Sequence, residues 1–307
     1  MNREYIRPVT IASVCGANAT PDEMFELTRQ AAKQHPDLIL LSECWHYRGG
    51  PVEAGIDHPM TKRIMALAKE FGVYIVHPLL MPDEDYDRNS ALVIDRNGEI
   101  IGRYDKTYPY WPELVEEGKV GGNFPGALHQ PVIDCDFGRI AVFICFDANF
   151  PDIWAYAAEQ GAELVLWPSA YAAGRQLEAH ALNNHYNIVS ATSSGHCMAF
   201  DINGERIVNV RNESVYVQWI TLDLDRCIFH ENYNMDKLEK LLAEKPRRIE
   251  VEKHWPEEQW IIVRSAIAGV SAREVCREAG MEELRSYKLR SRDYIDNLRK
   301  NGIKKDR

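Results

Sequence analysis

The stretch Arg139-Ile140-Ala141-Val142-Phe143-Ile144-Cys145 is a run of apolar residues that leads directly into a cysteine. A short continuous apolar run of this kind is typical of a strand that is buried on both faces. The segment that follows predicts a helix over about 152–160, and Glu163-Leu164-Val165-Leu166-Trp167 predicts a second buried strand. The order strand, helix, strand indicates an α/β sheet protein.

The same pattern extends in both directions along the chain. Thr20 and Pro21 suit a helix N-cap and a first helical residue, and Asn97-Gly98 and Asn203-Gly204 are hairpin turn signals. Further strands are expected at 9–14, 38–41, 73–76, 90–94, 99–104, 188–192, 198–201, 205–210 and 215–222, and further helices at 22–34, 59–71 and 174–186.

Composition narrows the class of protein. The chain has 307 residues, of which 45% are hydrophobic, enough for a large core. The net charge of −10 disfavours nucleic-acid binding, and no apolar run approaches the ~20 residues of a membrane span. The seven cysteines lack a C-x-x-C pair and the N-terminus lacks an apolar signal segment, so we expect free thiols, no metal and a cytoplasmic location.

The end of the chain differs from the rest in charge. Residues 245–307 contain 16 Lys and Arg against 11 Asp and Glu, which leaves a net charge of −15 on the first 244 residues. From about Pro256 the pattern is helical, with Ser271 as a helix N-cap and Gly280 as a stop. We therefore expect one domain over 1–245 and a helical extension over 246–307. The extension packs on the domain or on a partner subunit, or is solvated; its mixed charge disfavours a helix-turn-helix reader of DNA.

Three polar residues stand where predicted strands end: Glu43, Lys106 and Cys145. Each alone has an ordinary explanation as a solvated strand end, a solvated loop residue or a small core residue. Together they meet a chemical requirement, because a thiol of pKa about 8.5 needs a base before it can attack a carbonyl or nitrile carbon. The set predicts Cys145 as nucleophile, Glu43 as general base and acid, and Lys106 as oxyanion stabiliser, with no metal or organic cofactor.

Four blocks of sequence resemble the nitrilase superfamily of carbon–nitrogen hydrolases over about residues 7–225. They are residues 38–43 (LILLSE), 102–108 (GRYDKTY), 140–152 (IAVFICFDANFPD) and 161–170 (GAELVLWPSA). The resemblance implies the same Glu43, Lys106, Cys145 triad, a four-layer α-β-β-α sandwich of two packed sheets, and a homodimer or larger homo-oligomer. It also implies a second pocket glutamate, for which Glu113 fits best and Glu116 and Glu117 are rivals.

Departures from the family pattern bear on the substrate. Tyr108 stands where the family often has His, and His180 and Asn183 replace charged residues of a later helix. The run Cys145-Phe146-Asp147 resembles the amidase and carbamoyl-amine members more than the nitrile hydrolysers. Arg175 is either a partner for a substrate carboxylate or a solvated helix residue. The expected substrate-binding residues are Tyr108, Trp111, Phe146, Asn149, Trp167 and Arg175.

The resulting hypothesis is a hydrolase that cleaves a small linear amide or N-carbamoyl amine and releases ammonia. Nitrile hydrolysis and acyl transfer use the same triad and stay open as alternatives. A scaffold that binds partners without catalysis is an alternative of another class. The expected partner is a small amide or ureido molecule, with neither nucleic acid nor membrane involved.

Overall fold

The computed structural model describes residues 6–16, 19–43, 45, 55–82, 86–116 and 122–302. The chain forms two compact units: a large unit, Val9–Leu222, and a small unit, made of Met1–Pro8 and Asp223–Arg307. The compact units therefore divide between Leu222 and Asp223, upstream of the boundary expected at 245/246, because the chain after 222 forms a sheet of its own.

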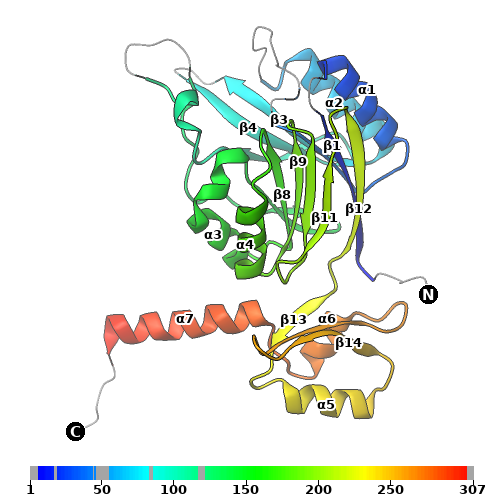
Figure 1. The fold of residues 1–307 in the computed structure, drawn as a ribbon, viewed down its shortest axis with the longest axis vertical. Helices are drawn as coiled ribbons and strands as arrows, with labels where there is room; N and C mark the ends of the chain where they lie inside the picture. Colours follow the sequence, from blue (N-terminus) through cyan, green and yellow to red (C-terminus); the bar gives the residue numbers. More distant parts are fainter. Residues whose placement is uncertain are drawn as a thin grey trace. The chain divides into compact units, whose positions relative to one another are not determined.

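The large unit contains two six-stranded sheets (Figure 1). The first has the strand order β12-β1-β2-β3-β4-β5, and the second has the order β11-β10-β9-β8-β7-β6. In the first sheet β1, β2 and β3 are parallel, and in the second β7, β8 and β9 are parallel. The strands of the first sheet are β1 (Pro8–Cys15), β2 (Leu38–Leu41), β3 (Tyr74–Pro82), β4 (Asp87–Ile94), β5 (Ile100–Asp105) and β12 (Tyr216–Asp223). Those of the second are β6 (Ile133–Cys135), β7 (Gly138–Val142), β8 (Leu164–Ser169), β9 (Asn187–Thr192), β10 (His196–Phe200) and β11 (Arg206–Arg211).

The parallel strands form the centre of each sheet because their sequences are apolar on both faces. All four residues of β2 are buried, and Leu38 lies between Ile11 of β1 and Tyr74 of β3. The two sheets pack on one another, since β2 contacts β8 and β9. Across this interface the Ser13 hydroxyl donates a hydrogen bond of 2.7 Å to the backbone oxygen of Ser190.

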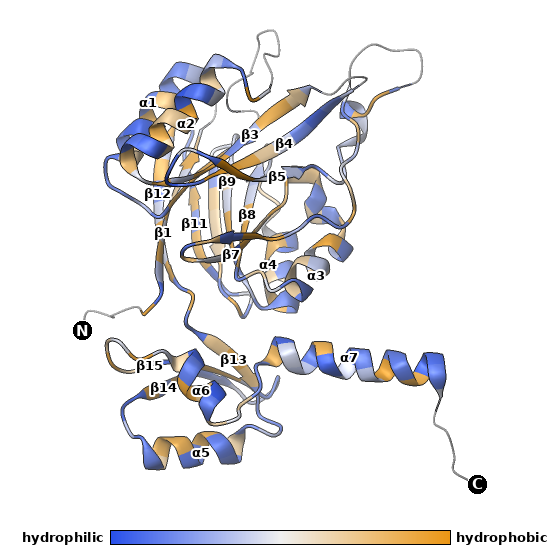
Figure 2. Ribbon diagram, turned by 180° about the vertical axis from the view of Figure 1, so that it is seen from behind, coloured by the Kyte–Doolittle hydropathy of each residue, from blue (hydrophilic) through white to orange (hydrophobic). Residues whose placement is uncertain are grey.

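Helices cover the outer faces of the two sheets (Figure 1). On the first sheet, α1 (Pro21–Ala32) and α2 (Pro59–Phe71) bury Met24 and Ile64 in one core with Ile39. Both helices show hydrophobic and hydrophilic segments, as expected for helices with one buried face (Figure 2). On the second sheet, α4 (Gly174–Asn184) contacts β9, β10 and α3 (Pro151–Glu159). The predicted four-layer α-β-β-α sandwich is thus confirmed.

The small unit is a three-stranded antiparallel sheet of order β13-β15-β14 with three helices. Its elements are β13 (Cys227–His230), α5 (Met235–Glu244), β14 (Ile249–Trp255), β15 (Trp260–Ser265), α6 (Ala272–Glu278) and α7 (Leu284–Asn301). The expectation of helix from Pro256 onward is wrong for β15, because Ile261 and Val263 of that strand complete a core with Phe229. The prediction of Ser271 as a helix N-cap is confirmed, because its hydroxyl accepts a hydrogen bond from the backbone N–H of Glu274.

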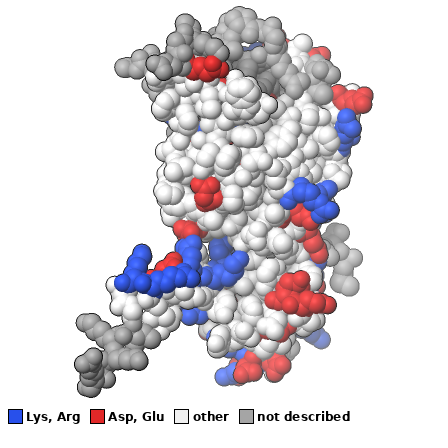
Figure 3. All heavy atoms as spheres, turned by 60° about the vertical axis from the view of Figure 1, so that its left-hand side comes forward, with Lys and Arg blue, Asp and Glu red and all other residues white. Residues whose placement is uncertain are grey.

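The predicted C-terminal helix α7 is present and basic, and Lys and Arg gather on its surface (Figure 3). Leu284, the first residue of α7, is 2% exposed. Across the described residues, no helix combines the length and apolar character that crossing a bilayer requires.

Candidate active site

Cys145 lies at a sharp turn between a strand and a helical segment. The chain leaves β7, passes through Ile144 and enters the short 3-10 helix η2 (Cys145–Asn149). The backbone of Cys145 has φ of 50°, in the left-handed region that non-glycine residues rarely adopt. The indole N–H of Trp167 donates to the backbone oxygen of Cys145 at 3.2 Å. The turn therefore holds the thiol at the carboxyl edge of the sheet, where α/β folds place reacting groups.

The other predicted residues meet at the same edge of the sandwich. Lys106, which follows β5, lies with its Nζ 2.9 Å from Oε1 of Glu43 and 2.9 Å from Oε2 of Glu113. Glu43 and Lys106 are each 1% exposed, and Cys145 is 7% exposed. A buried ammonium thus lies between two carboxylates, and the charges of Glu43 and Lys106 both act on the Cys145 thiol.

The electrostatics of the site favour a neutral thiol and a charged lysine. Burial, together with the negative charge of Glu43, raises the pKa of Cys145 to about 12, although Lys106 acts in the opposite direction. Burial lowers the pKa of Lys106, but the charges of Glu43, Cys145 and Glu113 outweigh it and the pKa is raised above the ordinary value. The thiol therefore keeps its proton at neutral pH, and its ionisation requires a nearby base.

A buried carboxylate, that of Asp147, joins the segment of Lys106 to the turn of Cys145. Its two oxygens accept hydrogen bonds of 2.8 Å from the backbone N–H of Ile144, the backbone N–H of Tyr108 and the hydroxyl of Tyr104. Burial raises the pKa of Asp147 to about 7, against the effect of these donors. The sequence prediction did not assign this residue a role, although its place two residues after Cys145 was a usable signal.

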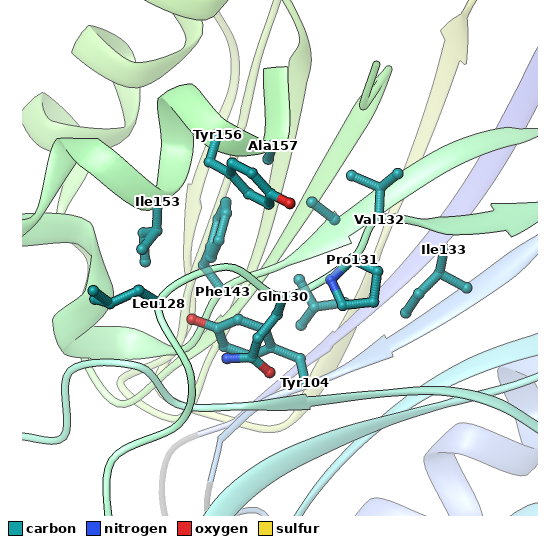
Figure 4. Close-up of a pocket in the computed structure, with 12 residues that line it drawn as sticks. Tyr104, Leu128, Gln130, Pro131, Val132, Ile133, Phe143, Ile153, Tyr156 and Ala157 are labelled. Carbon is teal, nitrogen blue, oxygen red and sulfur yellow. The ribbon is translucent and has the colours of Figure 1, made fainter. Parts of the chain in front are cut away.

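The ring of Tyr104 is held in place by its neighbours. It lies edge-on to Phe143, with ring centroids 5.6 Å apart, and beside a small cavity that Leu128 and Gln130 also line (Figure 4). The volume of this cavity is about 10 Å³, room for about one water molecule. Tight packing here fixes the direction in which the Tyr104 hydroxyl points toward Asp147.

A larger pocket of about 410 Å³ opens above the thiol. Its walls combine aromatic rings with two side-chain amides, and the lining residues are Tyr110, Glu113, Cys145, Phe146, Asn149, Ala170, Tyr171 and Gln176. Gln176 donates to Oδ1 of Asn149 at 2.6 Å, and Asn149 donates to the hydroxyl of Tyr171 at 3.4 Å. Tyr171 and Gln176 were not among the predicted residues, although both follow the end of β8 closely.

Of the expected substrate-binding residues, Phe146 and Asn149 line the pocket and the other four do not. Tyr108 stacks on Phe150, with centroids 3.8 Å apart, and donates its hydroxyl to Asp152 at 2.8 Å. Trp111 is 69% exposed, and Trp167 is buried behind the cysteine turn.

Arg175 also lies outside the pocket lining. Its side chain is 89% exposed, and its guanidinium lies 3.3 Å from a carboxylate oxygen of Glu178, as expected for a solvated helix residue. Of the rivals to Glu113, Glu116 is exposed and Glu117 lies outside the described residues. Within the described ranges no group of His, Cys, Asp and Glu is arranged to hold a metal ion.

Comparison with known proteins finds a family model and relatives of the same kind. Residues 11–229 match the family model of the carbon–nitrogen hydrolases. Over 118 residues the chain is 35% identical to β-ureidopropionase of Arabidopsis thaliana. This match spans 38% of the present chain but only 28% of that protein. Over 232 residues it is 24% identical to deaminated glutathione amidase of Yersinia enterocolitica, covering 65% of this chain and 81% of that one.

The fold is similar to that of Nit3 of Saccharomyces cerevisiae, a member of branch 10 of the nitrilase superfamily. The TM-score is 0.59 at 20% identity, over 78% of this chain and 94% of the Nit3 chain. The family model covers all of the large unit except its first two residues. The matched range includes all four blocks that resemble the superfamily. The chain therefore belongs to the carbon–nitrogen hydrolase family, as its resemblance to the nitrilase superfamily predicted.

Proposed function

We propose that the large unit cleaves the C–N bond of a small linear amide or N-carbamoyl amine through an acyl-enzyme on Cys145, with release of ammonia. The observation that carries this proposal is the lysine at 2.9 Å from each of two carboxylates, beside a buried thiol. This arrangement supplies a nucleophile, a base and a fixed positive charge in one water-poor site.

In the first step Glu43 takes the proton of the Cys145 thiol while the sulfur attacks the carbonyl carbon. The carbonyl oxygen then becomes negative. Lys106 and the backbone N–H of Phe146, at the first turn of η2, stabilise this oxyanion. Because Lys106 is buried and paired, its charge needs little rearrangement during the reaction.

In the second step the C–N bond breaks and protonated Glu43 gives its proton to the departing nitrogen, which leaves as ammonia. Glu43 then removes a proton from water, and the hydroxide attacks the thioester carbon. The product acid leaves and the thiol regains its proton. Glu113 holds the other side of the Lys106 ammonium and faces the pocket, where it orients the substrate amide nitrogen.

The pocket favours a substrate whose distal part carries no carboxylate. Among its described lining residues, aromatic rings and the Asn149–Gln176 amide pair surround the thiol, and the charged member is Glu113. Amide side chains form hydrogen bonds with neutral polar groups, and aromatic rings cover apolar ones. One relative is named as a ureidopropionase and another as an amidase, which supports both classes of scissile group.

The test is release of ammonia from matched linear amides, N-carbamoyl amines and nitriles, with Cys145→Ala alongside. Cys135→Ala is the matched control, because burial raises the pKa of that thiol to about 12 as well, and it lies on β6, away from the pocket. We expect release from amides or carbamoyl amines, abolished only in Cys145→Ala. A product trapped by added amine or hydroxylamine faster than hydrolysis would favour acyl transfer. Activity that persists in Cys145→Ala would refute the proposal.

A further inference from the structure

We propose that Asn89 is a positioning residue that commits one oxygen of Glu43 to accepting the thiol proton. The proposal rests on the function given above, in which Glu43 is the base. Asn89 lies on β4 and is 3% exposed. Its side-chain N–H donates to Oε1 of Glu43 at 2.8 Å.

The two oxygens of Glu43 have different surroundings. Oε1 accepts from Asn89 and also from Lys106 Nζ, at 2.8 Å and 2.9 Å. Oε2 is buried and has no hydrogen-bond partner among the described residues. Hydrogen bonds to a charged oxygen are strong and occupy its lone pairs, so a proton added to Glu43 goes to Oε2.

An unpartnered carboxylate oxygen in a buried site costs free energy, so its presence calls for a reason. The reason is that Oε2 is the atom that gains and loses a proton in each cycle. Asn89 contributes by fixing the plane of the carboxylate, because turning the group out of this orientation would break the hydrogen bond between Asn89 and Oε1.

Asn89 also controls the second charged group of the site. Its backbone oxygen accepts a hydrogen bond of 2.8 Å from the backbone N–H of Lys106. The side chain of Asn89 thus orients Glu43, and its main chain fixes the backbone position of Lys106 just after β5. Asn89 is not among the residues that line the pocket, so it acts on the reaction through Glu43 and not by touching the substrate.

The experiment measures alkylation of Cys145 by iodoacetamide at neutral pH, with the site of label read by peptide mass. This reaction needs the thiol proton to be removed but needs no knowledge of the natural substrate. Asn89→Leu keeps the branched shape and the number of heavy atoms of the side chain and removes the donor. Asn187→Leu is the matched control, because Asn187 is also 3% exposed. It is the first residue of β9, at the opposite end of that strand from Thr192, which pairs with Ser169 of β8. Circular dichroism and thermal unfolding establish that each variant is folded.

We expect alkylation of Cys145 to slow by about 10- to 100-fold in Asn89→Leu, the effect of losing one buried hydrogen bond to a charged group. The Asn187→Leu rate stays at the wild-type level. Once an amide substrate is found, kcat falls by a similar factor while KM is unchanged. A folded Asn89→Leu protein that is alkylated at the wild-type rate overturns the proposal.

Two further variants separate this inference from the function beneath it. If Asn89→Leu does not fold, Asn89→Ala removes the same donor to Oε1 of Glu43 without adding bulk on β4, and it slows alkylation by a similar factor. A wild-type rate in Asn89→Ala again overturns the proposal. If Glu43→Gln is alkylated at the wild-type rate, the base itself is misassigned and the proposed function fails with it. Slow alkylation of Glu43→Gln together with a wild-type rate for Asn89→Leu overturns only the role of Asn89.

Discussion

Replacing Asp147 with asparagine tests whether the carboxylate that joins the Lys106 segment to the cysteine turn carries a proton in the folded protein. Burial raises the pKa of Asp147 from an ordinary value of 3.8 to about 7. Between these two pH values the folded state binds a proton that the unfolded state has released. The stabilisation by this proton is therefore complete below about pH 4 and is lost as the pH rises through about 7.

The size of the effect follows from proton linkage. Within that window the free energy of unfolding falls by about 1.4 kcal/mol for each pH unit, or about 4 kcal/mol in all. The Asp147→Asn variant would lack this titration. Its new side-chain amide, facing the N–H groups of Ile144 and Tyr108, would add an offset that does not depend on pH.

The assay is urea unfolding of wild type and Asp147→Asn from about pH 4 to about pH 8, followed by circular dichroism and tryptophan fluorescence together. The stability of wild type relative to the variant should fall across the window and then become constant. A difference that is the same at every pH would refute the reasoning. It would mean that the three donors hold Asp147 ionised and cancel the effect of burial.

Three further substitutions test other parts of the site and the fold. Glu113→Gln removes one of the two carboxylates on Lys106, and we expect kcat/KM for an amide substrate to fall by about 10- to 100-fold. Arg175→Ala should leave the KM of that substrate unchanged, because its side chain is 89% exposed and outside the pocket lining; a large rise in KM would contradict this placement. Gly195→Ala should lower the free energy of unfolding by more than about 1 kcal/mol, measured by urea, because a Cβ there would lie 2.1 Å from a backbone oxygen at φ of +80°. Gly72→Ala, at φ of +64° with nothing within 4 Å, is its control and should cost less.

Much of the large unit was predictable because its sequence signals are local. The apolar run 38–41 became β2 with the expected bounds, and the helix over 59–71 ends at Gly72 in the left-handed conformation, as expected of a helix stop. Thr20 and Glu23 form a full capping box at the start of α1. In each case a few neighbouring residues determine the structure, so no knowledge of distant contacts was needed.

The small unit was harder to predict because its strands depend on distant partners. Residues 260–265 form a strand since they pair with β13 and β14, and the first of these pairings joins Val263 to Cys227, far apart in the chain. The active site shows the same limit. Strand-end positions predicted Glu43, Lys106 and Cys145 as candidate site residues, but the contact of Asn89 with Glu43 joins residues 46 positions apart and leaves no local signal.

The left-handed backbone of Cys145 has a consequence for how this protein would respond to losing its thiol. A side chain at φ of 50° costs about 1 to 3 kcal/mol, a cost that glycine does not carry. Cys145→Gly would then be inactive yet more heat-resistant than wild type, if relief of the turn exceeds the loss of packing by the thiol. If Cys145 is the nucleophile that we propose, activity and resistance to heat make opposite demands on this one position, and the glycine variant would be a heat-resistant protein that binds an amide without cleaving it.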